Sequence, residues 1–128
     1  MVDFMKCEWG EALMKSDWEE VRVARVFIFV KDFPDEGVLL EDLKPLVNSI
    51  REKATDMIIR ADLSGMGLVG IERFKQIMAL VQEVVEYTKE DNLLRKIEIQ
   101  GAGFIFRTLY GPISLAIPKY FRDMIQFI

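Results

Sequence analysis

Segments with the pattern of a strand and segments with the pattern of a helix alternate along most of this chain. Apolar runs at 57–61 and 94–100 have the length of strands, and the segment between them, 71–87, carries apolar residues at helical spacing. An earlier strand pattern at 21–33 precedes a helical pattern at 39–54. Strands that alternate with helices predict crossover connections. We therefore expect a single α/β domain over residues 1–128, with a mostly parallel sheet of four to five strands and helices on both faces.

The other segments are shorter. Residues 4–14 predict an edge strand, and 124–128 predict a last strand. Pro45 is expected in the first turn of its helix, where a missing N–H costs little. Gly111-Pro112 is expected to halt a helix that begins at Phe104. The full predicted order is strand, strand, helix, strand, helix, strand, a helical region and a final strand.

The composition indicates a globular protein. The chain has 128 residues, of which 51% are hydrophobic and 30% charged, with a net charge of −4. This acidic balance argues against nucleic acid as a partner. No apolar run approaches the ~18 residues that a transmembrane segment needs, and the first residues lack the pattern of a signal peptide. A cytoplasmic location is the resulting expectation.

The residues that most enzymes and metal sites need are scarce. There is no histidine, and Cys7 is the only cysteine, so an internal disulfide cannot form. The usual metal ligand and the usual general base at neutral pH are therefore absent. Carboxylates and lysines remain, but no pair of them stands out. We expect no enzyme activity, no catalytic residue, no metal and no cofactor.

In the second half of the chain, the turn Asp62-Leu63-Ser64-Gly65 closes an apolar strand, and a long helix and another strand follow it. Phe104 and Phe106 come directly after that second strand. This pattern resembles the CRAL-TRIO family of lipid-binding domains, in which a D-L-x-G-like turn closes the strand and aromatic residues follow an N-A-P motif. Ile125 matches the isoleucine of its terminal K-I. The resemblance covers about residues 55–128 and implies a sheet with an aromatic-lined apolar face.

The resemblance implies a non-enzymatic module that binds a lipid, another hydrophobic ligand or a protein partner. Six residues are candidates to line the ligand groove: Phe104, Phe106, Ile113, Leu115, Ile117 and Phe121. Three basic residues could meet a phosphate headgroup or a membrane surface: Arg107, Lys119 and Arg122. The alternative is that the apolar residues pack as core and that the basic ones are solvated charge. Asp62 could face a ligand, or its carboxylate could stabilise its own turn.

The chain also departs from the family pattern. Its Y-P-E-R-like segment is absent, N-A-P is replaced by Gly101-Ala102-Gly103, and Met124 replaces the lysine of K-I. The headgroup chemistry of the phosphoinositide-binding members therefore does not carry over.

STAS domains offer a second resemblance, because they also carry a D-[LV]-S-G-like turn after a strand. In switching STAS members, a serine or threonine in the next turn is phosphorylated. Residues 66–70 here are Met-Gly-Leu-Val-Gly, which supply no hydroxyl group. A STAS-like chain of this kind would be a regulatory protein-interaction domain without the phospho-switch.

The apolar end of the chain predicts assembly. Residues 124–128 form an apolar strand that no helix follows, and apolar patches on soluble monomers are usually covered. We expect a homodimer or a complex with another protein, which Phe127→Asp would disrupt if Phe127 lies in the interface. Alternatively, the apolar N-terminal segment covers this face.

Overall fold

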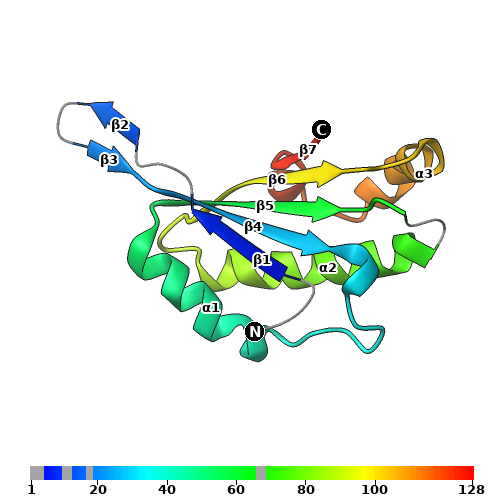
Figure 1. Cartoon of the computed structure of the whole chain (residues 1–128). Helices are drawn as coiled ribbons and strands as arrows, with labels where there is room; N and C mark the ends of the chain where they lie inside the picture. Colours follow the sequence, from blue (N-terminus) through cyan, green and yellow to red (C-terminus); the bar gives the residue numbers. More distant parts are fainter. Residues whose placement is uncertain (1–4, 10–12, 17–18, 66–68) are drawn as a thin grey trace.

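The computed structural model describes residues 5–9, 13–16, 19–65 and 69–128. Figure 1 shows their arrangement. The described elements, in chain order, are β1 (Met5–Trp9), β2 (Leu13–Ser16), β3 (Glu19–Val21), β4 (Val23–Phe29), a 3-10 turn (Val30–Asp32), α1 (Leu40–Lys53), β5 (Asp56–Asp62), α2 (Val69–Tyr87), β6 (Leu94–Gln100), α3 (Phe104–Ser114), α4 (Lys119–Arg122) and β7 (Ile125–Phe127).

The main sheet has five strands in the order β1-β4-β5-β6-β7. Strands β4 to β7 are mutually parallel, and β1 pairs with β4 in the antiparallel direction. The predicted fold class is confirmed: the chain is α/β, with a five-stranded, mostly parallel sheet flanked by helices. Strands β2 and β3 form a separate antiparallel hairpin that projects beyond the main sheet (Figure 1).

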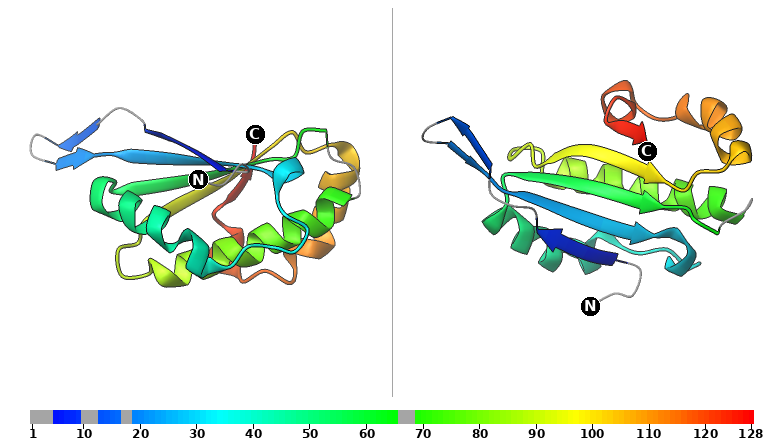
Figure 2. Two further views of the ribbon diagram at one scale, coloured as in Figure 1. Left: turned by 60° about the horizontal axis from the view of Figure 1, so that its bottom comes forward. Right: turned by 45° about the horizontal axis from the view of Figure 1, so that its top comes forward.

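The helices lie on one face of the sheet, whereas the sequence predicted helices on both faces. Helices α1 and α2 run beneath the same side of the strands (Figure 2), and α3 packs on α2 and β7 through Phe106. The strand order explains the difference, because β4, β5, β6 and β7 follow one another without a reversal. Crossovers of one hand then place every connecting helix on the same face.

The core lies between the sheet and this helical layer. Alternate residues of β4 and β5 are buried, among them Val26, Ile28 and Ile59, and Ile97 and Ile99 of β6 join them. The apolar stripes of α1 and α2 supply the other side: Leu43, Val47, Ile50, Phe74, Ile77, Met78, Leu80, Val81 and Val84 are all buried. The helix-facing half of the sheet is thus a continuous apolar surface.

Two helices run through residues that were expected at their ends. Pro45 is the sixth residue of α1 rather than a first-turn residue, and the helix continues beyond it to Lys53. Helix α3 passes through Gly111 and Pro112 to Ser114, so these residues do not halt it. Packing of Phe106 and Tyr110 against Phe127 supports α3, and such tertiary contacts routinely outweigh helix propensity.

Candidate functional site

An apolar groove of about 460 Å³ lies between α2 and the segment that contains α3 and α4. Phe74 and Phe121, both fully buried, belong to its wall. Lys75 and Gln82 of α2 add polar groups. The lining residues are Phe74, Lys75, Met78, Ala79, Gln82, Pro112, Ile113, Ala116, Ile117 and Phe121. Three of the six predicted groove residues therefore meet here: Ile113, Ile117 and Phe121.

The other three predicted groove residues lie elsewhere. Phe106 is 7% exposed and is part of the core, where its ring makes an edge contact with Phe74 at a centroid distance of 4.9 Å. Phe104 is 84% exposed and Leu115 is 79% exposed, and neither lines the groove. These three residues therefore lie apart from this groove, because Phe106 packs against Phe74 and Phe127 while Phe104 and Leu115 are exposed.

The three basic residues predicted to meet a headgroup each have an intramolecular contact. Arg107 donates from Nε to the carbonyl of Ala102 at 3.3 Å, and its guanidinium lies 5.2 Å from the ring centroid of Phe127. Lys119 pairs with a carboxylate oxygen of Asp123 at 3.3 Å. Arg122 donates to the carbonyl of Ser114 at 3.3 Å. These contacts tie the three side chains to their own segment of the chain.

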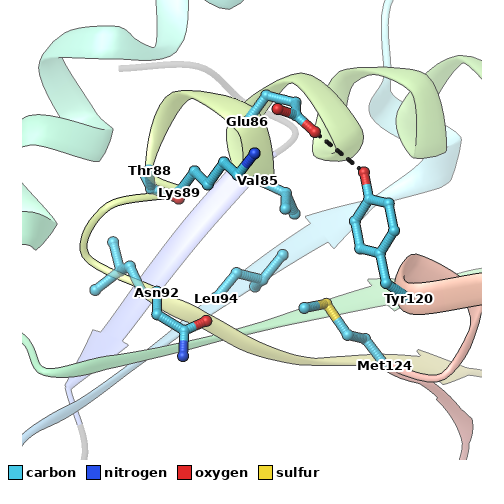
Figure 3. A pocket seen from close by; sticks show the side chains of 9 residues that line it. Val85, Glu86, Thr88, Lys89, Asn92, Leu94, Tyr120 and Met124 are labelled. Carbon is cyan, nitrogen blue, oxygen red and sulfur yellow. Dashed lines mark hydrogen bonds between the residues drawn. The ribbon is translucent and has the colours of Figure 1, made fainter.

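A second pocket, of about 280 Å³, lies where α2 ends and β6 begins (Figure 3). The Tyr120 hydroxyl donates to Glu86 Oε1 at 3.2 Å, which joins α4 to α2. The Thr88 hydroxyl donates to the carbonyl of Val84 at 2.9 Å, so its proton is engaged in the last turn of the helix. The pocket is lined by Val85, Glu86, Thr88, Lys89, Asn92, Leu93, Leu94, Tyr120 and Met124. Sequence reasoning missed this pocket because its walls come from segments that share no motif.

The turn after β5 is held by its own residues. Asp62 Oδ1 accepts a hydrogen bond from the backbone N–H of Ser64 at 2.8 Å, so the Asp62 carboxylate stabilises its own turn. Gly101, at φ +74°, packs so closely on Ser64 that a Cβ atom would clash with it. The stretch 66–68, which holds most of the STAS-like switch position, lies outside the described residues.

The sheet surface opposite the helices, called the open face here, carries half-buried apolar side chains among charged ones. Its members follow from the strand register: Lys6, Glu8, Val23, Arg25, Phe27, Phe29, Asp56, Ile58, Arg60, Asp62, Lys96, Glu98, Gln100 and Gln126. Glu98 is only 7% exposed. Its Oε1 accepts hydrogen bonds from Arg60 Nε at 3.1 Å and Nη2 at 2.9 Å, and Arg25 Nε lies 3.8 Å from the same oxygen.

Two side chains near these surfaces have perturbed protonation equilibria. Burial beside Phe127 raises the pKa of the Tyr110 phenol, and the nearby charge of Arg122 partly opposes that rise. Burial under the sheet edge also raises the pKa of the Cys7 thiol. Both shifts favour the neutral form, which is the unreactive form of each group at neutral pH.

No helix within residues 5–9, 13–16, 19–65 and 69–128 is both long and apolar enough to cross a membrane. Over the same residues, no group of three or more cysteine, aspartate or glutamate side chains is placed to hold a metal ion.

Comparison with known proteins returned no match: no family model, no curated protein and no solved structure is similar to this chain. The likenesses to CRAL-TRIO and STAS domains therefore depend on the sequence motifs described above.

Proposed function

We propose that this protein is a non-enzymatic binding module of the CRAL-TRIO type that holds a hydrophobic ligand in the groove between α2 and the α3–α4 segment. The observation that carries the proposal is the groove itself, whose wall includes Ile113, Ile117 and Phe121. Its volume of about 460 Å³ falls within the ~300–1,000 Å³ of pockets that take small molecules. These three are among the six groove residues that the resemblance implies.

The groove is open, so binding should be modest. Each buried methylene group contributes about 0.8 kcal/mol, so the burial of about eight of them would contribute about 6 kcal/mol. This free energy corresponds to a dissociation constant of tens of micromolar. A second chain that covers the groove would tighten the binding by excluding water from the rest of the ligand.

A fluorescence titration with anthroyloxy-labelled palmitate tests the proposal. Ala116 is exposed at the groove, so Ala116→Trp should fill the groove without disturbing the core and should weaken binding at least tenfold. Thr108→Trp is the control, because Thr108 is exposed on α3 and does not line the groove. Native mass spectrometry of protein purified from cells should show a bound lipid. Equal binding by the wild type and Ala116→Trp would refute the assignment.

The second candidate function is that of a STAS-like regulatory domain, which binds a protein partner and lacks the phospho-switch. The open face favours it, because a parallel sheet is normally covered on both faces. In this view the protein partner binds the uncovered face of the strands rather than the groove.

Location and assembly complete the proposal. A cytoplasmic location and peripheral contact with a membrane fit the function of a lipid-binding module. Homodimerisation stays a prediction, but Phe127→Asp is a poor test of it. Phe127 packs against Phe106 and Tyr110, with Arg107 over its ring, so the aspartate would disturb the fold itself.

A further inference from the structure

We propose that the pocket formed by the end of α2, the start of β6 and α4 is a second ligand site, which takes a free amino acid with an apolar side chain. This site is separate from the groove and does not rest on the function proposed for it. The pocket has a volume of about 280 Å³, whereas the groove has about 460 Å³. Its size is below the usual range for drug-sized ligands, so its ligand is a compact molecule rather than a long acyl chain.

The inner wall of the pocket is apolar. Leu94 is buried, and Val85 and Met124 are half-buried. Figure 3 shows Leu94 and Met124 on one side of the space, with Glu86 and Lys89 on the other. A branched or aromatic side chain of a ligand would be removed from water against this wall, which favours binding.

Two opposite charges at the exposed edge of the pocket give the ligand its orientation. Glu86 and Lys89 are three residues apart at the end of α2, and both line the pocket. Within the described part of the chain Lys89 forms no ion pair, so these two side chains are not paired with each other. Glu86 Oε1 accepts the hydrogen bond from the Tyr120 hydroxyl at 3.2 Å, while Oε2 accepts none from a described residue. An ammonium group on a ligand can therefore meet Glu86, and a carboxylate on the same ligand can meet Lys89.

A zwitterion fits this pocket better than a singly charged ligand does. A ligand with only an ammonium group would leave Lys89 without a partner, and a ligand with only a carboxylate would face Glu86. Asn92 also lines the pocket, and its side-chain amide can donate a hydrogen bond to the ligand's carboxylate. The charged residues nearby that do not line the pocket are either paired, as in Asp91–Arg51 and Lys119–Asp123, or exposed and screened by solvent, as are Glu83 and Glu90.

Amide chemical shifts in titrations with four small ligands test the proposal: leucine, leucine methyl ester, 4-methylpentanoate and glycine. Leucine should bind at least threefold more tightly than the ester or 4-methylpentanoate, because each of these lacks one of its two charges and exposed ion pairs contribute modestly. Glycine should bind more weakly still, because it lacks the apolar side chain. The shifts should change at Leu94 and Met124 and stay unchanged at Ile113 in the groove.

Two single variants separate the charges. Lys89→Gln should weaken leucine binding at least threefold without weakening the binding of the methyl ester. Glu86→Gln should weaken leucine binding to the same extent without weakening the binding of 4-methylpentanoate, and glutamine keeps an oxygen that can accept from Tyr120. Glu83→Gln and Lys53→Gln are the matched controls, because they remove the same charges from exposed positions outside the lining, and each should change leucine binding less than twofold.

Thermal unfolding checks that all four variants are folded. The proposal is overturned if leucine does not bind, if leucine and its methyl ester bind equally to the wild type, or if the shifts centre on the groove. Binding of dihexanoyl phosphatidylethanolamine at this pocket without binding of leucine would indicate a lipid headgroup site and would also overturn it. The palmitate titration with Ala116→Trp tests the groove independently of all these outcomes.

Discussion

The two faces of the main sheet are built by the same strands from different kinds of residue. On the helix-covered face, the described positions of the central strands are apolar, as at Ala24, Ile59 and Ile97. On the open face, charged side chains alternate with apolar ones, as at Arg25 and Phe27 of β4 and at Ile58 and Arg60 of β5. One face therefore has the composition of a protein core, and the other mixes apolar and charged side chains.

The two faces of the sheet therefore contribute differently to folding stability and to binding. Burial on the covered face contributes most of the folding free energy, because the hydrophobic effect scales with apolar area removed from water. The open face adds ion pairs and half-buried apolar groups that gain little from folding alone. A partner that covered it would remove that area from water on binding instead.

Neighbouring isoleucines on β5 provide the most direct test of this contrast. Ile59 faces the helices at 4% exposure, whereas Ile58 lies half-buried on the open face. We expect Ile59→Ala to lower the free energy of unfolding by about 2–5 kcal/mol, because it leaves a cavity in the core. Ile58→Ala should cost about 1 kcal/mol or less. Urea denaturation of both variants measures the difference. Equal costs would mean that the open face is already part of a core, and the contrast would fail.

The ion pair between Arg60 and Glu98 should have a smaller effect. Because Glu98 is nearly buried, Glu98→Gln should destabilise by about 1.5–3 kcal/mol, the usual range for a hydrogen bond to a charged group. A double-mutant cycle with Arg60→Gln isolates the coupling energy of the pair. The exposed pair Lys119–Asp123 is the matched control and should couple by about 0.5 kcal/mol or less. If Arg60 and Glu98 couple as weakly as Lys119 and Asp123, then solvent reaches the centre of the open face.

Much of the fold follows from local patterns in the chain. The apolar spacing of 71–87 predicted α2, and the apolar run at 94–100 predicted β6. The one-sided placement of the helices did not follow, because strand order depends on contacts between distant segments. The pattern at 21–33 predicted a strand, but it could not show that Phe27 and Phe29 would lie on a face that no helix covers.

Only part of the groove lining could be predicted from the sequence, for a similar reason. Phe104 and Phe106 are two residues apart, and on a helix that spacing places side chains on different sides. Only Phe106 therefore turns toward the core, and the motif alone could not show which of the two would do so. Ile113, Ile117 and Phe121 line the groove beside α2, and their role in ligand binding stays a prediction.

The smallest effect concerns β1, where the two faces can be compared at adjacent residues. Cys7 points to the covered face opposite Val26, and Lys6 points to the open face opposite Phe27. Burial raises the pKa of the Cys7 thiol, so the folded state favours the neutral form. The resulting contribution to stability is present below the thiol pKa of the unfolded chain and is lost as the pH rises through the higher pKa of the folded chain.

We expect iodoacetamide to react with Cys7 at pH 8 about three to ten times more slowly than with the cysteine of a Lys6→Cys/Cys7→Ser variant. In urea the two rates should converge. If Cys7 reacts as fast as the cysteine at position 6 in the folded proteins, then β1 does not hold its register against β4, and the contrast between the faces does not extend to this edge of the sheet.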